Sequence, residues 1–384
     1  MNRFLTILWY TICILIATNA DAQSAEKPFE FRGQAISWLH YNPSNEESVL
    51  LGGRYLPQIN YRINLKENRL FDLEASGNIF GTAAIDPFTD AETDGKIKPY
   101  RAWIRYSTPQ FEVRAGLQKI NFGSATMLRP LMWFDQIDPR DPLKLTDGVW
   151  GVLGRYYFLN NANIWVWGLA GNKNPKGWEQ AQTNTNFPEF GGRFQFPVPS
   201  GESGITYHHR FASTENLTDL NLPVFNKIPE NRFGYDIRLD YVIGFWLEGS
   251  WINKQADLGW LKNQEVFNAG ADYTFGIGSG LYTAFEQLVF SFDEKAFAMK
   301  QAATFSLLSL SYPIGIFDQI SAIVYYDWTN NNAYNFINYQ RQFNKLTLYV
   351  MAYWNPENFN IPLQGGTTNI FGGKGIQLML VFNH

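Results

Sequence analysis

Apolar and polar side chains alternate along most of the chain, from Phe29 almost to the C-terminus. In residues 231–243, for example, Phe233 and Tyr235 alternate with Arg232. A period of two residues predicts β-strands, because successive side chains of a strand point to opposite faces. Eighteen such segments are predicted, at residues 29–42, 50–66, 69–81, 97–107, 110–120, 148–159, 162–171, 189–197, 203–213, 231–243, 244–255, 264–276, 279–291, 301–312, 318–328, 333–342, 345–355 and 373–383.

The connections between these segments are alternately short and long. Every second connection is a predicted tight turn, such as Glu67-Asn68, whereas connections such as 121–147 and 172–188 are long. Short turns at one rim and long loops at the other are typical of bacterial outer-membrane barrels, with the turns in the periplasm and the loops outside. A soluble β-sandwich or propeller has no reason to sort loop lengths in this way.

Aromatic rings on the apolar face lie near the ends of the predicted strands, among them Tyr100, Tyr106 and Tyr241. Rings at both edges of an apolar band fit a lipid interface better than a dry core. The last segment places Phe382 close to the C-terminus, and such a strand is the expected contact with the barrel-assembly machinery. The pattern therefore predicts an all-β protein, a transmembrane antiparallel β-barrel of 16–18 strands, with 18 the direct count.

The composition supports a barrel in contact with lipid. Aromatic residues make up 17% of the 384 residues, while charged residues also reach only 17%, below the roughly 25% usual for soluble domains. After the N-terminus, no apolar run approaches the ~20 residues of a transmembrane helix. The net charge of −4 lacks the basic footprint of a nucleic-acid binder, so no such partner is expected.

The N-terminus has the three parts of a secretory signal peptide. Arg3 supplies the positive start, residues 4–17 are almost wholly apolar, and Ala20-Asp21-Ala22 provides small residues for cleavage. An anchor helix is the alternative, but the apolar run is short for a bilayer. We expect a signal peptide over 1–22 and one barrel domain over 23–384 in the bacterial outer membrane. The only cysteine lies in the signal peptide, so the mature chain has no thiol chemistry.

A more specific pattern covers residues 114–158. It contains the run R-A-G-L-Q-K-I-N-F-G from Arg114, a loop rich in D-P pairs at 138–142, and a strand that opens with G-V at 148. This pattern resembles Gram-negative porin-like and export-channel barrels, including the alginate-export-like families. The resemblance implies a pore-forming or channel-like role, but it specifies no substrate.

Motifs for catalysis or metal binding are scarce. His208 and His209 point to opposite faces of a predicted strand, so they cannot bind one zinc ion together. A lipid-facing lipase would need a serine–histidine pair, and no serine partner can be assigned to His209. The acidic loop 86–94 is similar to the start of a calcium-binding loop, but Arg101 stands where the final glutamate belongs. We expect no enzyme activity, cofactor or metal site, and weak calcium binding at 86–94 is left open.

The charged residues of the predicted strands mostly face the barrel interior. Alternation assigns nine arginines to a basic wall of the channel: Arg62, Arg101, Arg105, Arg114, Arg155, Arg193, Arg210, Arg232 and Arg238. It assigns five acids to a facing wall: Asp236, Asp240, Glu248, Asp272 and Glu286. Opposed walls would set up a transverse field across a wide barrel, in which water or a plug must fill the centre. The alternative is that these charges pair and fill the interior.

The connection 121–147 is too apolar for a freely solvated loop, because it contains Leu128, Leu131 and Trp133. We expect it to fold inward as a constriction loop that presents charged residues to the channel: Arg129, Asp135, Asp138, Arg140 and Asp141. A structural plug or a contact between subunits of a homo-oligomer is the alternative.

These features predict an outer-membrane channel for the diffusion of small hydrophilic solutes. The alternative from another class is the barrel component of a secretion, adhesion or assembly system, in which the extracellular loops are the working surface. A fold of this kind does not decide between them.

Overall fold

The structure is a computed structural model that describes residues 28–44, 48–85, 92–220, 222–357 and 370–384. The predicted signal peptide 1–22 and most of the acidic loop 86–94 lie outside the described residues. Within the described part of the chain, no helix is both long and apolar enough to cross a membrane.

The described chain is built almost entirely from β-strands. They are β1 (Phe29–Tyr41), β2 (Val49–Leu65), β3 (Arg69–Ile85), β4 (Glu92–Ser107), β5 (Phe111–Gln118), β6 (Val149–Tyr157), β7 (Asn163–Leu169), β8 (Gln182–Thr183), β9 (Glu189–Val198), β10 (Gly201–Ser213), β11 (Ile228–Asp240), β12 (Gly244–Lys254), β13 (Asn263–Phe275), β14 (Leu281–Asp293), β15 (Ala303–Pro313), β16 (Asp318–Asp327), β17 (Asn332–Gln342), β18 (Leu346–Trp354) and β19 (Lys374–Asn383). Two short 3₁₀ turns, η1 (Thr218–Leu220) and η2 (Gly259–Leu261), complete the elements.

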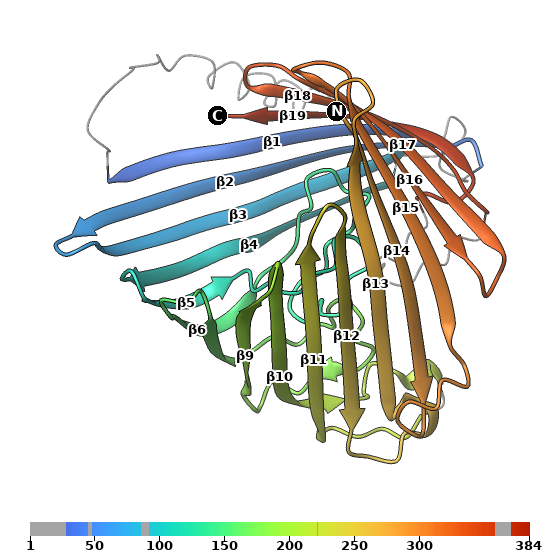
Figure 1. Ribbon diagram of the computed structural model, residues 1–384. Helices are drawn as coiled ribbons and strands as arrows, with labels where there is room; N and C mark the ends of the chain where they lie inside the picture. Colours follow the sequence, from blue (N-terminus) through green and yellow to red (C-terminus); the bar gives the residue numbers. More distant parts are fainter. Residues whose placement is uncertain (1–27, 45–47, 86–91, 221, 358–369) are drawn as a thin grey trace.

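The strands form one antiparallel sheet that closes on itself. β1 pairs with β2 along one edge and with β19 along the other. β8 pairs only with the end of β10, whereas β7 pairs directly with β9, so the wall of the barrel contains eighteen strands. In Figure 1, β1–β4 run across the view and β10–β13 run steeply down it, as expected for tilted strands on different sides of a barrel. The predicted all-β antiparallel barrel of 18 strands is confirmed.

The connections separate into two sets, one at each rim of the barrel. At one rim the chain turns over short segments, which are 66–68, 108–110, 158–162, 199–200, 241–243, 276–280, 314–317 and 343–345. In the turn from β2 to β3, Glu67 and Asn68 have φ of 60° and 56°, the left-handed backbone that tight hairpin turns use. The other rim carries the long connections, among them 119–148, 170–188 and 214–227.

The two faces of the wall differ in polarity and exposure. On β11, Phe233 and Tyr235 point outward and remain 46% and 47% exposed, while Arg232 and Asp236 point inward and are buried. This arrangement is the reverse of a soluble protein and is the one a lipid-embedded barrel requires.

One aromatic residue does not lie on the face that simple alternation assigns to it. The register between β3 and β4 shifts at Ser76/Gly77, and this bulge leaves Tyr100 without a direct partner on β3. Tyr100 then packs with Ile36 and Leu56 in an interior cluster. The expectation that Tyr100 belongs to the outward aromatic band is wrong, because an inserted residue reverses the faces of a strand beyond it.

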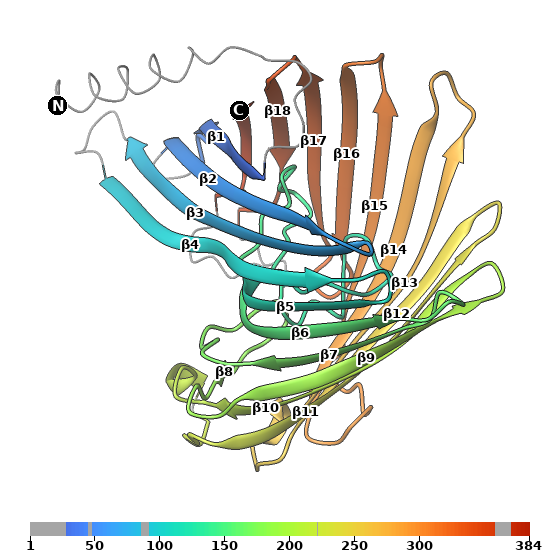
Figure 2. The same cartoon turned by 90° about the vertical axis from the view of Figure 1, so that its left-hand side faces the viewer.

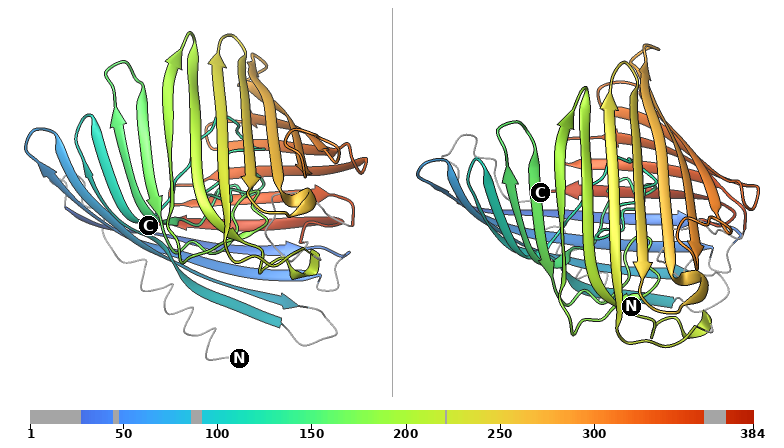
Figure 3. Two further views of the ribbon diagram at one scale, coloured as in Figure 1. Left: turned by 90° about the horizontal axis from the view of Figure 1, so that it is seen from below. Right: turned by 60° about the horizontal axis from the view of Figure 1, so that its bottom comes forward.

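Two of the long connections enter the barrel instead of leaving it. The coil 119–148 lies between the walls in Figure 2 and Figure 3, and it contacts inner-face residues of strands around the barrel. The connection 170–188 packs on top of it, where Trp178 donates its indole N–H to the carbonyl oxygen of Arg129 at 2.9 Å. These two segments therefore lie inside the barrel and narrow the space that the eighteen strands enclose.

Candidate functional site

The candidate functional site is the barrel interior, where the segment 119–148, here called the inner loop, is bound by carboxylates of the wall. Glu286 of β14 accepts hydrogen bonds from the backbone N–H groups of Thr126, Met127 and Leu128 at 2.8, 3.1 and 2.6 Å. It also accepts the hydroxyl of Thr126 at 2.9 Å and the amide of Asn268 at 3.3 Å. A single buried side chain therefore satisfies three consecutive N–H groups of the loop.

Glu248 of β12 binds the loop in the same way at two further points. Its oxygens accept the N–H of Ala125 at 2.8 Å and the N–H of Leu131 at 2.7 Å. Gly123 makes this approach possible, because a Cβ at that position would lie 2.4 Å from the Glu248 carboxylate and its φ is +108°. Glu248 and Glu286 thus hold the loop by its main chain.

Apolar side chains of the loop pack against the wall on either side of these carboxylates. Leu128 and Met132 join a buried cluster with Leu307, Tyr325 and Tyr334 from β15, β16 and β17. The predicted inward folding of apolar residues 127–134 corresponds to this packing, which removes them from water.

Toward β6 and β7, the loop contributes further aromatic rings. Trp133 and Phe134 pack with Leu153 and Trp167 in a second buried cluster. Gly234 on the wall makes room for Leu131 and Trp133, since a Cβ at position 234 would lie 2.4 Å from Leu131 and 3.2 Å from Trp133.

The second half of the inner loop crosses to the opposite wall. Leu143 and Leu145 are partly buried against Ile36 and Met379 of β1 and β19. Arg101 of β4 donates to the carbonyl oxygen of Thr146 at 2.8 Å, close to where the loop returns to β6. The loop therefore touches wall strands on all sides of the interior and is fixed at both ends.

The charged residues predicted to face the channel from this loop behave differently from one another. Arg129 and Asp135 are buried and form an ion pair of 2.8 Å, so they fasten the loop internally and do not present charge to a channel. Arg140 is also buried and pairs with Asp138, whose side chain remains 37% exposed. Asp141 accepts the N–H groups that follow it in the loop. Of the five, Asp138 is the one with substantial exposure.

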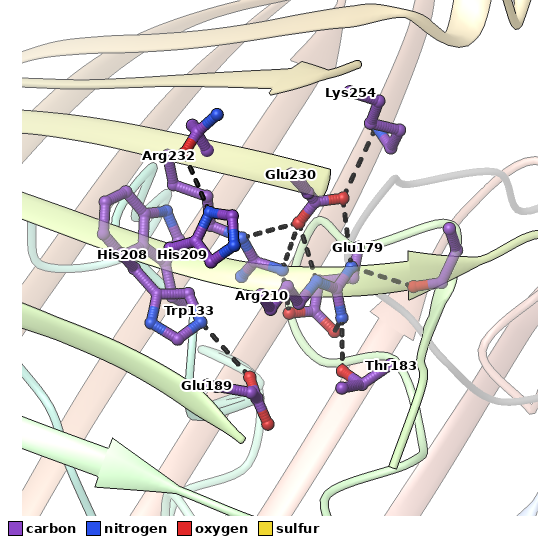
Figure 4. A network of polar contacts seen from close by, with 12 residues as sticks. Trp133, Glu179, Thr183, Glu189, His208, His209, Arg210, Glu230, Arg232 and Lys254 are labelled. Atoms are coloured by element: carbon purple, nitrogen blue, oxygen red, sulfur yellow. Dashed lines mark hydrogen bonds and ion pairs between the residues drawn. The ribbon is translucent and has the colours of Figure 1, made fainter. Parts of the chain in front are cut away.

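Arg210 of β10 and Arg232 of β11 lie in a buried network near the long-loop rim (Figure 4). Arg210 donates to Glu230 at 2.7 Å and lies 3.2 Å from Glu179, and Arg232 contacts the same two carboxylates at 2.7 and 2.6 Å. Glu179 belongs to the connection 170–188, so this network attaches that connection to the wall. Lys254 completes it at 4.0 Å from Glu230.

Other members of the predicted walls also pair with acids. Arg193 contacts Asp236, with 3.0 Å between Nη2 and Oδ2, and Ser124 of the inner loop donates to the same carboxylate at 2.9 Å. Arg238 contacts both Asp240 and Asp272 at 2.9 Å. The structure therefore does not have two exposed walls of opposite charge at these residues. The charges form ion pairs, as the alternative of paired charges filling the interior expects, because an unpaired buried charge is costly.

A third group of charges lies nearer the turn rim and is more open to solvent. Arg105, Arg114 and Arg155 surround Glu112 at 3.4, 3.2 and 3.5 Å, and Arg105 also pairs with Asp72 at 2.6 Å. The arginine side chains are 15–22% exposed. Three cations around two anions leave an excess of positive charge.

The remaining predicted wall residue, Arg62, is exposed at the turn rim, directly across from Asp72 in the register of β2 and β3. The acids Glu179 and Glu230 and the base Lys254 were missed by reasoning on the sequence. Glu230 has the same parity as Arg232, so extending the predicted strand 231–243 by one residue toward the N-terminus predicts it. Glu179 lies in a loop, where no periodicity gives a face.

Two groups in the long connections have altered pKa values. Burial raises the pKa of the Asp141 carboxyl, and the N–H groups of Leu143 and Leu145 oppose that shift. Burial lowers the pKa of the Lys176 ammonium, which donates to the carbonyl oxygen of Gly148 at 3.3 Å. Both shifts favour the uncharged form, as desolvation does.

The side chains of His208 and His209 lie on opposite faces of β10, as their adjacent positions in a strand predict. His208 is buried inside and contacts Glu189 at 3.2 Å, while His209 lies on the outer face, 2.9 Å from Asn231. Among the described residues, no three His, Cys, Asp or Glu side chains are grouped so that they could hold a metal ion.

Comparison with known proteins finds likeness in structure alone. No protein-family model matches the chain, and no curated protein sequence matches it. The crystal structure of OccAB2 from Acinetobacter baumannii matches with a TM-score of 0.55 at 9% identity, covering 93% of this chain and 97% of that chain. An engineered variant of the Rh. blastica porin matches with a TM-score of 0.46 at 12% identity, covering 93% and 100%.

The fold defines a class, that of closed antiparallel β-barrels. The likeness to OccAB2 is one of fold at this level of identity. The narrower resemblance to alginate-export-like families receives no support from these comparisons and stays a prediction.

Proposed function

We propose that this protein is an outer-membrane channel for small hydrophilic solutes, in which the inner loop sets the width of the passage. The observation that carries the proposal is the inner loop itself, held at mid-barrel by Glu248 and Glu286 inside a wall with an apolar outer face. A barrel that only served as a membrane anchor would need no such fitted segment inside it.

The charges nearer the turn rim give the channel its electrostatic character. The cluster of Arg105, Arg114 and Arg155 carries more positive than negative charge and is partly exposed. Partly exposed cations raise the local concentration of anions. The proposed channel therefore favours anions modestly.

Planar-bilayer recording of the purified barrel tests the proposal directly. The parent protein should give discrete conductance steps, and replacing 127–137 by a glycine–serine linker of equal length should raise the step size. Arg114→Gln together with Arg155→Gln should move the reversal potential in a salt gradient toward cation preference. A barrel that inserts but passes no current, both before and after the loop replacement, would refute a channel function.

The alternative, a barrel that serves secretion, adhesion or assembly through its extracellular loops, predicts a different result. The long connection 170–188 folds inward and is bound by Arg210 and Arg232, so it is not available as a free external surface over its whole length. Liposome swelling with small sugars separates the two functions, because only an open channel admits the solute.

A further inference from the structure

The connection 294–302, between β14 and β15 in Figure 1, folds back over the outer face of the barrel. Its Phe297 donates a backbone N–H to Glu265 at 2.9 Å, and the Phe297 ring lies 5.3 Å from the ring of Trp251. Its Lys300 donates a backbone N–H to Asp293 at 2.8 Å. The connection thereby covers two carboxylates that lie on the outside of the wall.

The outward position of Glu265 follows from its neighbours in β13. Gln264 reaches inward to donate to the carbonyl oxygen of Trp178, and Val266 packs in the interior cluster. Glu265 lies between them and points to the other face, where Phe267 is exposed. A carboxylate on the lipid-facing side of a barrel is unusual enough to require a compensating group.

Two buried side-chain oxygens beneath the connection 294–302 have no hydrogen-bond partner among the described residues. Glu265 and Ser291 stand directly opposite each other in the register of β13 and β14, and both are 0% exposed. The Oε2 atom of Glu265 and the Oγ atom of Ser291 make no hydrogen bond. Asp293, two residues further along the same face of β14, is 8% exposed. Diagonal neighbours of this kind are within reach of one ligand.

The charge of this group has no cation in direct contact among the described residues, and Lys254, the cation that acts on Glu265 from a distance, is itself bound to Glu230. Within the described part of the chain, neither Glu265 nor Asp293 takes part in an ion pair, although both are buried at the edge of the apolar band. Burial of two carboxylates without a counter-charge is costly. A hard divalent cation neutralises both and takes oxygen ligands from carboxylates, hydroxyls and water.

We propose that a divalent cation, calcium or magnesium, binds between β13 and β14 at Glu265, Ser291 and Asp293, beneath the connection 294–302. The cation fastens this connection to the outer wall. The site is independent of the channel function, because it lies on the opposite face of the wall from the inner loop.

Terbium luminescence tests the site, because Trp251 is the direct cross-strand neighbour of Glu265 on β12 and can sensitise a bound ion. Barrel in detergent, stripped with chelator, is titrated with Tb³⁺ under tryptophan excitation, and the bound ion is then displaced with Ca²⁺. We expect one saturable site per chain that Ca²⁺ displaces. Trp251→Phe should lose most of the emission while it keeps its Ca²⁺ affinity by calorimetry.

Variants of the ligands decide the proposal. Glu265→Gln should weaken Ca²⁺ at least tenfold, and Ser291→Ala and Asp293→Asn should each weaken it several-fold. Glu67→Gln removes an exposed carboxylate at the turn rim and should leave the affinity unchanged. Absence of a Ca²⁺-displaceable signal, or parental affinity in Glu265→Gln, would overturn the proposal. If that variant does not fold, parental affinity in both Ser291→Ala and Asp293→Asn overturns it equally.

Discussion

Glu286→Gln is the most informative single change in the barrel interior, because it alters the attachment of the inner loop with no loss of volume. One carboxylate oxygen accepts from Thr126 and Met127, and the other accepts the N–H of Leu128 at 2.6 Å. An amide has only one acceptor oxygen. Whichever way it is turned, its NH₂ group faces an N–H of the loop, and at least one of these buried donors loses its partner.

The magnitude follows from the cost of such a group. A buried donor left unsatisfied costs about 1–3 kcal/mol, and the loss of charge assistance adds about 1 kcal/mol, so the attachment weakens by roughly 2–4 kcal/mol. A change of 3 kcal/mol alters the ratio of attached to detached loop by roughly 150-fold. The barrel itself should stay folded, because its strand pairing does not depend on Glu286.

Single-channel recording is the assay. We expect Glu286→Gln to show a higher mean conductance and frequent fluctuations between levels, and limited proteolysis should cut the inner loop sooner. Glu67→Gln is the matched control, since Glu67 lies in the exposed turn between β2 and β3 and pairs with Arg69, away from the loop. Current traces and cleavage rates of Glu286→Gln that match those of the parent and the control would refute the reasoning.

Three further predictions concern the wall and the topology. Leu308 lies outward at the middle of β15, so Leu308→Arg should lower the free energy of unfolding by about 2–4 kcal/mol. Leu239 lies one residue from the end of β11, so Leu239→Arg should lower it by about 0–1 kcal/mol. Equal losses in the two variants would contradict a lipid-facing apolar band. Gly234→Ala should cost about 1–3 kcal/mol by crowding the inner loop, and a urea midpoint equal to that of the parent would contradict the close fit. A cysteine at the exposed Asn174 should react with an impermeant thiol reagent on intact cells and one at Asn160 should not, and the reverse pattern would invert the topology.

The strands could be predicted from sequence because period-two alternation records the one constraint that all of them share, an apolar outer face. The eighteen wall strands lie where the pattern places them, with ends that differ by a few residues. Where a bulge interrupts the pattern, as at Tyr100, alternation gives the wrong face, since a shift of one residue has no signature in polarity alone.

Partners inside the barrel were less predictable. Alternation correctly sends Arg210 and Arg232 to the inner face, but it cannot show that they meet Glu179, which comes from a long connection. The buried pair of Arg129 and Asp135 was missed although both lie in the inner loop, because a loop has no periodicity that assigns its side chains to a face. Pairing across distant segments depends on how a loop returns into the barrel, and local sequence does not encode that path.

The way in which the inner loop is attached has a consequence for redesign. Glu248 and Glu286 bind backbone N–H groups between Ala125 and Leu131, groups that every residue except proline possesses. A side chain in this stretch can therefore be replaced without removing these main-chain contacts. At the exposed Thr126, for example, a substitution removes the hydroxyl bond to Glu286 but keeps the backbone N–H bond. Substitutions at a few positions of the inner loop can therefore change the side chains that line the proposed passage, while the loop backbone and the barrel keep their conformation.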